Sequence, residues 1–369
     1  MGAVRRISVP LGQRRYDVRI GSRHLGRLGV LLARLKLGTH AVIVTNPTLV
    51  RHHARAVRRV LMKAGFPVDT LTVPDTERSK SLGTLGQLIG RLAGLDRPGR
   101  RPFLVLVGGG VVGDLGGLVA GLYRRGIPYV QVPTTLLAQV DSSLGGKTGV
   151  DLPEGKNLVG LFNQPSIVFI ELDFLSTLPD RQFRSGLAEV AKCGVIQDPV
   201  LFKLLERTQV TTLRRSPGLL AQVVARAVQV KASVVGRDER ETLGIRTILN
   251  FGHTLGHALE TAARYDTRIC THGEAVAVGM IAATRISQRM GLIPDSAAGR
   301  IHRLMDHLGL PASLRGMKLS SILRAMAHDK KWAMGRNRWV LPAGIGRAVV
   351  RRGVPERIVR ESIRTVLEG

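Results

Sequence analysis

Short apolar runs alternate with helix-length segments through the first half of the chain. Runs of strand length and apolar, mostly β-branched composition occupy Ala41–Thr45, Pro67–Val73, Phe103–Val107, Tyr129–Val132 and Ile167–Ile170. The segments between them, one rich in Arg and His up to Lys63 and another over Ser81–Leu95, have helical spacing. Apolar strands separated by helices are typical of a parallel sheet covered on both faces. This pattern predicts an α/β domain over residues 1–175.

The pattern changes after about Leu172, where strand-like runs give way to long segments with helical spacing. These segments are Asp180–Cys193, Pro199–Arg207, Leu219–Val235, Arg246–Arg264, Gly273–Met290 and Ala297–Leu308, followed by a small strand pair near Arg338–Leu341 and Ala348–Arg351. We therefore expect a mostly α-helical second domain over residues 176–369. A cleft between the two domains is the expected place for a ligand.

Composition narrows the class of protein. Hydrophobic residues make up 44 % of the 369 residues and charged residues 22 %, which is the balance of a soluble globular protein. No uncharged apolar run reaches the roughly 18 residues that a membrane span needs. The basic N-terminus lacks a following apolar stretch, so we expect a cytoplasmic protein. Two cysteines, Cys193 and Cys270, are too few for a disulfide framework or a thiolate zinc cage.

The formal net charge of +28 raises the question of a nucleic-acid partner. However, the basic residues are spread along the chain, and aromatic residues, which would stack on single strands, make up only 4 %. We therefore expect neither a nucleic-acid nor a membrane partner, and interpret part of the charge as a site for a doubly anionic small molecule.

A glycine-rich motif directly follows the strand Phe103–Val107. Gly108, Gly110 and Gly113 satisfy the pattern G-x-G-x-x-G, in which backbone N–H groups approach a phosphate that a Cβ would push away. The acidic residue that usually follows about 20 residues later is missing, since Ile127–Ala138 contains no Asp or Glu. The motif therefore indicates a tight turn or a Rossmann-like site that holds its dinucleotide differently from the common fingerprint.

A second candidate site covers Pro133–Thr148 and continues to Asn157. It combines Asp141, Lys147 and Lys156 with several hydroxyl side chains in a glycine-rich region, which suits an anion. Its Gly-Lys-Thr end is similar to a Walker A loop, but the first glycine of that loop would fall on Asp141. A nucleotide triphosphatase is therefore disfavoured, and a solvated loop is the alternative.

The third constellation contains metal-binding residue types. His253 and His257 lie four residues apart, so they share one face of a helix, and His272 begins another predicted helix. A carboxylate such as Glu189 together with two histidines would leave coordination positions open, as a catalytic metal site requires. Lys192, one turn after Glu189, is suited to exchange a proton and hold charge beside that metal. The alternatives are a structural histidine pair and a surface charge pair.

Taken together, these strings resemble the 3-dehydroquinate synthases, within the wider sugar-phosphate cyclase family. The matching segments are Gly108–Asp114, Tyr123–Gly126, Gln131–Lys147, Gly155–Asn157, Thr177–Pro179, Gly186–Lys192, Asp238–Glu239, Leu249–His257 and His272–Met280. The resemblance implies a homodimeric lyase of the shikimate pathway with NAD and a divalent metal, Zn or Co. It would convert 3-deoxy-D-arabino-heptulosonate 7-phosphate to 3-dehydroquinate and phosphate, with NAD reduced and then reoxidised in each cycle.

The resemblance also implies roles for individual residues. The implied metal ligands are Glu189, His253 and His272. The implied NAD contacts are Asp75, Glu77, Lys80, Gly110, Val111, Val112, Gly113, Asp114, Thr134, Thr135, Lys147, Lys156, Phe174, Leu175, Ser176 and Thr177. Lys231 and Arg246 would hold the substrate carboxylate, and Asn157, Lys331 and Arg125, the last from the other subunit, would hold the phosphate. The implied catalytic residues are Lys192, His257, Asp141, Lys147 and Asn250, of which His257 and Asn250 lie near the phosphate.

Two departures from the family pattern stand out. Asn46 occupies the place where many members have an Asp against the adenine ribose, and the segment Glu241–Arg246 is one residue longer than expected.

Two other functions remain open at this point. One is a sister cyclase acting on a neutral sugar phosphate, which would leave Lys231 and Arg246 without a carboxylate. The other is a polyol dehydrogenase with a similar two-domain body.

Overall fold

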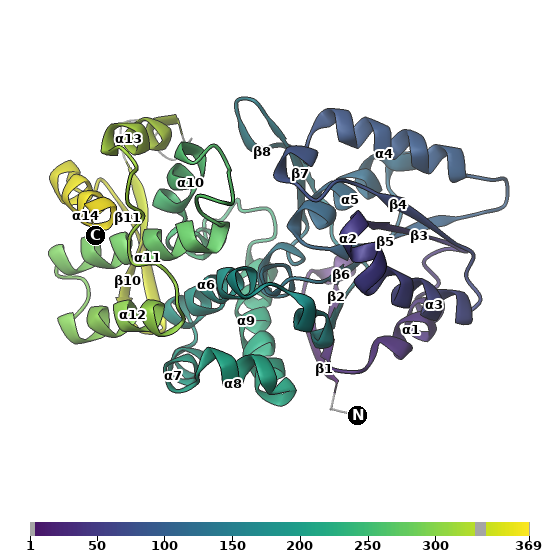
Figure 1. The fold of residues 1–369 in the computed structure, drawn as a ribbon, viewed down its shortest axis with the longest axis horizontal. Helices are drawn as coiled ribbons and strands as arrows, with labels where there is room; N and C mark the ends of the chain where they lie inside the picture. Colours follow the sequence, from purple (N-terminus) through teal and green to yellow (C-terminus); the bar gives the residue numbers. More distant parts are fainter. Residues whose placement is uncertain (1–3, 329–336, 369) are drawn as a thin grey trace. The chain divides into compact units, whose positions relative to one another are not determined.

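The computed structural model describes residues 4–328 and 337–368, and the chain divides into two compact units (Figure 1). The first unit contains the residues up to Pro179 together with Pro217–Gly236. The second contains Asp180–Ser216 and the residues from Arg237 onward. The segment Pro217–Gly236, which the sequence analysis assigned to the helical second domain, thus groups with the first unit.

The first unit is built on a seven-stranded sheet with strand order β1-β2-β9-β6-β5-β3-β4. Strands β2, β9, β6, β5, β3 and β4 run parallel, and only β1 pairs antiparallel, with β2, at one edge. The strands of the unit are β1 (Arg5–Val9), β2 (Tyr16–Gly21), β3 (His40–Thr45), β4 (Val68–Thr72), β5 (Pro102–Gly108), β6 (Tyr129–Pro133), β9 (Ile167–Glu171) and the separate hairpin β7 (Lys147–Leu152) and β8 (Gly155–Phe162). Its helices are α1 (Leu28–Leu35), α2 (Pro47–Leu49), α3 (Arg55–Lys63), α4 (Leu82–Leu95), α5 (Gly110–Leu122) and α9 (Pro217–Arg237).

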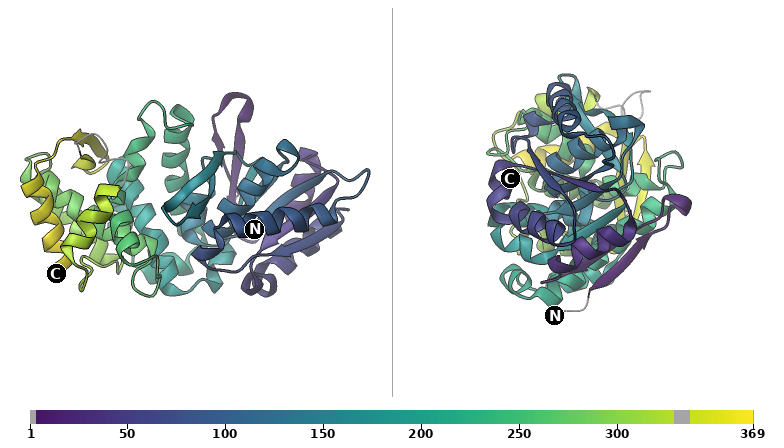
Figure 2. Two further views of the ribbon diagram at one scale, coloured as in Figure 1. Left: turned by 90° about the horizontal axis from the view of Figure 1, so that it is seen from above. Right: turned by 90° about the vertical axis from the view of Figure 1, so that its right-hand side faces the viewer.

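Helices cover both faces of this sheet (Figures 1 and 2). Along β3, Val42 and Val44 pack with the apolar side chains of α4 and α5. The alternating residues Ala41 and Ile43 pack with those of α1 and α3 on the opposite face. Because both faces are buried, every residue of β3, β5, β6 and β9 is buried, which explains their continuous apolar sequences.

Four strands of the first unit lie where the sequence analysis named none. The β7–β8 hairpin occupies part of the region interpreted as a glycine-rich loop, and Gly149 and Gly160 lie opposite each other in it. A Cβ on Gly160 would lie 2.1 Å from the carbonyl oxygen of Thr148, so these strands approach too closely for larger residues. Glycine at such positions hides the strand signal, because β-propensity scales penalise it.

Helix α9 is, among the described helices, the one long and apolar enough to cross a membrane by length and composition alone. However, 67 % of that stretch is buried within the protein, and the core helix of a soluble protein meets the same criteria. Near its end, Gly236 packs on Pro10, where a Cβ would lie 2.6 Å from the proline ring. Such burial identifies α9 as a core helix.

The second unit is mostly helical. Its helices are α6 (Asp180–Ile196), α7 (Pro199–Arg207), α8 (Val210–Arg215), α10 (His253–Ala262), α11 (His272–Arg289), α12 (Asp295–His307), α13 (Leu319–His328) and α14 (Glu356–Glu368), and its strands β10 (Arg338–Gly344) and β11 (Arg347–Arg352) form an antiparallel pair. The expected single helix over Arg246–Arg264 is wrong in one respect. A 3₁₀ turn, η8 (Arg246–Asn250), comes first, and α10 begins only after Gly252, whose φ of +82° interrupts the helix.

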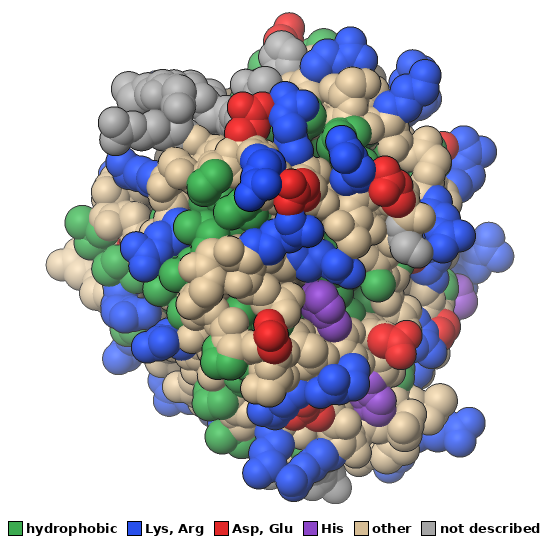
Figure 3. All heavy atoms as spheres, turned by 90° about the vertical axis from the view of Figure 1, so that its left-hand side faces the viewer, with side chains coloured by type: hydrophobic (Ala, Val, Ile, Leu, Met, Phe, Trp, Pro, Cys, Tyr) green, Lys and Arg blue, Asp and Glu red, His purple; other side chains and the backbone are tan. Residues whose placement is uncertain are grey.

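The positive charge of the chain is dispersed on the surface that Figure 3 displays. Lys and Arg side chains on that face are spread among apolar, acidic and neutral ones and do not gather in one continuous patch. Several basic residues of the second unit are paired with carboxylates, such as Arg300 with Glu206 and Arg360 with Glu356. A net charge distributed in this way contributes to solubility and long-range attraction of anions.

Candidate functional site

Two glycines allow the three helices that carry the predicted metal ligands to approach each other closely. A Cβ on Gly273, in the first turn of α11, would lie 1.9 Å from the carbonyl oxygen of Ser185 on α6. A Cβ on Gly279, two turns further along α11, would lie 1.9 Å from the carbonyl oxygen of Gly252, the residue before α10. Helices α6 and α10 therefore both contact the backbone of α11, which places Glu189, His253 and His272 near each other.

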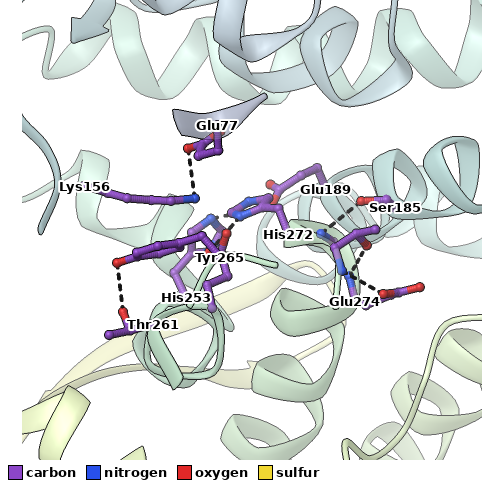
Figure 4. Close-up of polar contacts among 12 residues, drawn as sticks. Glu77, Lys156, Ser185, Glu189, His253, Thr261, Tyr265, His272 and Glu274 are labelled. Atoms are coloured by element: carbon purple, nitrogen blue, oxygen red, sulfur yellow. Dashed lines mark hydrogen bonds and ion pairs between the residues drawn. The ribbon is translucent and has the colours of Figure 1, made fainter. Parts of the chain in front are cut away.

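These three residues point toward one another in the second unit (Figure 4). Oε1 of Glu189 lies 3.5 Å from Nε2 of His253 and 3.5 Å from Nε2 of His272, and one ligand atom from each residue falls within 4.8 Å of the others. Two ligands about 2.1 Å from one tetrahedral metal ion lie about 3.4 Å apart. The observed spacing fits a shared divalent ion, and the sequence-predicted triad is brought together.

The outer nitrogens of both imidazoles are held by hydrogen bonds. Nδ1 of His253 lies 3.1 Å from the carbonyl oxygen of Phe251, and Nδ1 of His272 lies 3.1 Å from Oε2 of Glu260. Because a carbonyl or carboxylate oxygen accepts here, Nδ1 of each ring carries the proton. In the neutral form of each ring, the lone pair of Nε2 is then available to a metal.

The electrostatics of the two histidines differ. Burial, Lys192 and the neighbouring histidines hold the pKa of His253 well below its usual range. Burial also disfavours the charged form of His272, but the carboxylates of Glu260 and Glu189 outweigh it and raise the pKa of His272 to about 10. A metal ion binding here would therefore displace a proton from His272.

Lys192 and His257 complete this cluster. The Lys192 side chain is 2 % exposed, and its ammonium forms an ion pair with Oε2 of Glu189, one helical turn away on α6. The His257 ring centroid lies 5.3 Å from that of His253 and 6.4 Å from that of His272. A buried cation and a third imidazole thus border the triad.

A capping box fixes the start of α11, and hence His272. The Thr271 hydroxyl accepts a hydrogen bond from the backbone N–H of Glu274, and Oε2 of Glu274 accepts one from the N–H of Thr271 at 2.8 Å. Nε and Nη2 of Arg181, on α6, donate to the two carboxylate oxygens of Glu274, each at 2.8 Å. Figure 4 shows the position of Glu274. The first turn of α11 is therefore tied to α6 about two helical turns before Glu189.

In the first unit, Lys80 is the centre of a second polar cluster. Its Nζ donates to Oδ2 of Asp114 at 2.8 Å and to Oδ1 of Asn157 at 2.7 Å, while Lys156 pairs with Glu77 at 3.0 Å. Burial alone would lower the pKa of Lys80, but Asp114 and the other nearby carboxylates raise it, so the ammonium is retained. The structure thus gathers five residues that the resemblance assigned to NAD or substrate phosphate.

The glycine-rich motif forms the beginning of α5, with Gly109 as its N-cap residue. The first turn of α5 contains Gly110, Val111 and Val112, whose backbone N–H groups have no acceptor within the helix and can bind phosphate, whereas the N–H of Gly113 bonds the carbonyl oxygen of Gly109 at 3.0 Å. Thr134 and Thr135 follow β6, and a Cβ on Gly109 would touch the Thr135 side chain at 3.3 Å. The strand order reverses between β3 and β5, and in open α/β sheets this switch point is where nucleotides bind.

Asn46 and Asp75 lie at the same edge of the sheet. Oδ1 of Asn46 caps the turn that follows β3 by accepting from the N–H of Leu49 at 2.8 Å. Burial raises the pKa of Asp75, and a hydrogen bond from Asn46 opposes that rise. Since the Asn46 oxygen is already used as a cap, its amide nitrogen donates to Asp75. The carboxylate of Asp75 then remains as an acceptor at this position.

Lys231 of α9 contacts Asp141 within the first unit. Its Nζ donates to both Oδ1 and the backbone oxygen of Asp141 at 2.7 Å. Arg246 belongs to the second unit, where its Nη1 donates to the backbone oxygen of Glu239 at 2.7 Å and its N–H to Asp238 at 3.1 Å. The pairing of Lys231 with Arg246 around one carboxylate stays a prediction.

Other predicted residues lie on strand β7 and in short 3₁₀ turns of the two units. Lys147 is exposed on β7, Arg125 is exposed with a φ of +63°, and Asn250 ends η8 in a half-buried position. Phe174, Leu175, Ser176 and Thr177 form the 3₁₀ segment η7 (Leu172–Thr177) after β9. Lys331 lies outside the described residues.

Glu260 and His53 are among the residues that the sequence analysis does not single out. Glu260 lies two helical turns after His253, so the i, i+7 spacing on α10 could have indicated it. His53 bonds Thr177, which is 124 residues away, and no local pattern signals that contact.

The sequence of the chain is similar to those of 3-dehydroquinate synthases over nearly its whole length. Residues 70–185 match the family model of the 3-dehydroquinate synthase N-terminal region, and residues 186–332 match that of the C-terminal region. A 3-dehydroquinate synthase of Nostoc punctiforme is 44 % identical over 366 residues, covering 98 % of this chain and 99 % of the relative.

Solved structures show the same fold. A 2-deoxy-scyllo-inosose synthase complexed with carbaglucose-6-phosphate, NAD+ and Co2+ is 29 % identical, with a TM-score of 0.88, over 98 % of this chain and 100 % of that one. A 2-epi-5-epi-valiolone synthase from Streptomyces hygroscopicus subsp. jinggangensis, with NAD+ and Zn2+ bound, is 29 % identical, with a TM-score of 0.85, over 99 % of this chain and 98 % of that one.

Proposed function

The chain belongs to the 3-dehydroquinate synthase family, and on that premise we propose that it converts 3-deoxy-D-arabino-heptulosonate 7-phosphate to 3-dehydroquinate and phosphate. The proposal includes NAD as a recycled cofactor and one divalent ion, Zn or Co. The observation that carries it is the triad Glu189, His253 and His272, whose ligand atoms have the mutual spacing of a catalytic metal site.

The chain's own residues would hold both cofactors. Glu189, His253 and His272 would bind the ion, leaving positions open for substrate oxygens. The start of α5, Gly110–Asp114, would bind the pyrophosphate of NAD, with Thr134, Thr135, Lys147 and Phe174–Thr177 around the dinucleotide. Asp75, Glu77, Lys80 and Lys156 would contact its ribose hydroxyls. When bound, the ion supplies Lewis acidity and NAD supplies a reversible hydride transfer, so no net oxidation occurs.

Lys192 is assigned to the substrate hydroxyl that loses its proton. Its ammonium is buried and paired with Glu189, so it would lie beside the oxygen on which negative charge develops. Fixed cations in a water-poor site stabilise such charge more than solvent does. Asp141, held by Lys231, would orient a second hydroxyl of the substrate.

The two anionic groups of the substrate would be held separately. Lys231 and Arg246 would bind its carboxylate, as a cation pair suits. Asn157, His257, Asn250 and Lys331 would surround its phosphate, together with Arg125 of a second subunit. The proposal therefore includes a homodimer, and a cytoplasmic location consistent with the relatives being enzymes of biosynthesis.

A substrate panel tests the proposal against its two rivals. Purified protein with NAD and Co2+ or Zn2+ should release phosphate from the heptulosonate 7-phosphate, and far less from a neutral sugar phosphate. Preference for the neutral sugar phosphate would instead indicate a sister cyclase, such as the two structural relatives. Stoichiometric accumulation of NADH would indicate a dehydrogenase. Failure to release phosphate although both cofactors bind would refute the proposal.

A further inference from the structure

A π-helical turn carries a buried histidine toward the 3₁₀ segment η7. After β3 ends at Thr45, Asn46 caps the N-terminus of α2. The chain then forms the π-helical turn η3 (Val50–Ala54) between α2 and α3. Such wider turns are rare within helices and occur frequently at functional sites. His53, in this turn, is 4 % exposed.

His53 contacts two residues of η7. Its Nε2 lies 2.9 Å from Oγ1 of Thr177, and its ring stacks on Phe174 with 4.3 Å between ring centroids. All three residues belong to the first unit, and they join the segment after β3 to the segment after β9. In this position His53 can fix both the backbone position of η7 and the orientation of the Thr177 hydroxyl.

The hydrogen bonds of the Thr177 hydroxyl limit what it can offer to a ligand. Oγ1 lies 3.2 Å from the carbonyl oxygen of Phe174 as well as 2.9 Å from Nε2 of His53. The single hydroxyl proton goes either to that carbonyl or to Nε2, and in both cases a protein acceptor takes it. Toward a ligand, Oγ1 can therefore only accept a hydrogen bond.

We propose that His53 is a positioning residue of the dinucleotide site, which holds Thr177 so that its hydroxyl accepts a hydrogen bond from an N–H or O–H of the cofactor. This inference rests on the proposed function, because Thr177 is among the NAD contacts assigned there. The cofactor offers two sources of such a donor, the exocyclic amino group of adenine and the ribose hydroxyls.

The protonation state of His53 supports the same role. Burial, followed by the electrostatic effect of the neighbouring His52, lowers the pKa of His53 to about 4. The ring is therefore neutral throughout the physiological pH range. A neutral ring can keep one polarity of hydrogen bond to Thr177, whereas a charged ring would donate from both nitrogens.

The test measures the Kd of NAD for the full chain, without turnover, in four variants. His53→Phe keeps the ring stack but removes the hydrogen bond, and should weaken NAD binding about 10-fold. His53→Gln retains a polar group at the place of Nε2 and should restore most of the affinity. Thr177→Val should weaken binding to a similar extent, and Thr177→Ser should not. Thermal unfolding of each variant separates loss of fold from loss of positioning.

A cofactor analogue identifies the donor. In nicotinamide hypoxanthine dinucleotide a carbonyl replaces the adenine amino group, so an oxygen acceptor at Thr177 would reject it. If the wild type prefers NAD and Thr177→Val loses that preference, the donor is the amino group. If Thr177→Val weakens both dinucleotides equally, the donor is a ribose hydroxyl.

Other results would overturn the inference. If the wild type binds NAD and folded His53→Phe and Thr177→Val bind it equally well, the positioning role is wrong while the proposed function stands. If the folded wild type does not bind NAD at all, the proposed function fails and this inference fails with it.

Discussion

Oε2 of Glu260 accepts a hydrogen bond from Nδ1 of His272 at 3.1 Å, which leaves Nε2 of the same ring facing Oε1 of Glu189 at 3.5 Å. Glu260 is 6 % exposed and lies on α10, the helix that also begins with His253. One helix thus provides a metal ligand and, two turns later, the carboxylate that orients another ligand. Partners of this kind raise ligand basicity and fix the ring.

Removing that carboxylate should weaken the metal site while leaving the three ligands in place. Glu260→Ala should lower the affinity for Co2+ or Zn2+ by about 10- to 100-fold, and Glu260→Gln, which can still accept from Nδ1, by less. Competition with a chromophoric chelator measures the affinity directly. The control is Glu356→Ala, which removes an exposed carboxylate on α14 and should leave the metal affinity unchanged. Equal affinity of Glu260→Ala and the wild type would show that Glu260 does not orient His272.

The contact between α6 and α11 should be intolerant of a single methyl group. In Gly273→Ala the new Cβ would lie 1.9 Å from the carbonyl oxygen of Ser185, so the helices that carry Glu189 and His272 must separate. We expect a loss of about 1–3 kcal/mol in the free energy of unfolding, together with a weaker metal site. Urea denaturation and chelator competition measure the two effects.

A matched glycine gives the opposite expectation. Gly86 lies inside α4, and a Cβ there would meet nothing within 4 Å. Gly86→Ala should therefore stabilise the protein by about 0.5–1 kcal/mol. If both substitutions have the same effect, close packing at Gly273 is not what positions the helices.

Glu171 should make stability depend on pH in the acid range. Its side chain accepts hydrogen bonds from the backbone N–H groups of Arg23, His24 and Leu25 at 2.8–3.0 Å, at the end of β9 where η7 begins. Burial would raise the pKa of Glu171, but its bonds to His24 and to backbone N–H groups outweigh burial and lower it. The carboxylate contribution is therefore complete above the ordinary pKa of 4.5 and is lost as pH falls through the lower folded value.

Glu171→Gln should cost about 1.5–3 kcal/mol in the free energy of unfolding at pH 7. The difference from the wild type should shrink as pH falls below the ordinary pKa of 4.5 and through the lower folded value, where the wild-type side chain also loses its charge. Urea denaturation at several pH values gives both results. A difference that is constant from pH 7 to pH 3 would show that the charge of Glu171 is not the cause.

The pKa of His53 can be measured in the folded protein. Its ring resonances, identified by their absence in His53→Gln, should titrate near pH 4 because burial disfavours the charged ring. Heteronuclear NMR of the histidine side chains provides the titration curve. Titration near the ordinary value of 6.5 would show that the ring is solvated and does not hold Thr177 as proposed.

The sequence was most informative where one local period decides the structure. Parallel strands such as β5 are buried on both faces, so their apolar runs mark them, and the i, i+4 spacing of His253 and His257 marks a helix face. The sequence did not reveal the hairpin β7–β8, because Gly149 and Gly160, which lie opposite each other in it, weaken the strand signal. Sequence position places α9 with the helical half, whereas the contacts of its residues, such as that of Lys231 with Asp141, group it with the first unit.

Long-range polar contacts could not be predicted from the chain alone. The Lys80 cluster joins residues from η4 (Glu77–Ser79) to β8, and the contact of His53 with Thr177 depends on which strands lie side by side. Strand order is set by packing of the whole sheet, which periodicity does not contain. The residues Thr271 and Glu274 have the spacing of a capping box, which the sequence analysis did not identify, and no local pattern signals the contact of Glu274 with Arg181.

The most direct test of the account follows phosphate and NADH together in one reaction. Purified protein with NAD and Co2+ should release one phosphate per molecule of heptulosonate 7-phosphate. The concentration of NADH, followed by its absorbance, should stay below the enzyme concentration. The variant Glu189→Ala, which lacks the carboxylate of the triad, should release none. Phosphate release by Glu189→Ala at the wild-type rate, or no release by cofactor-loaded wild type, would contradict the account.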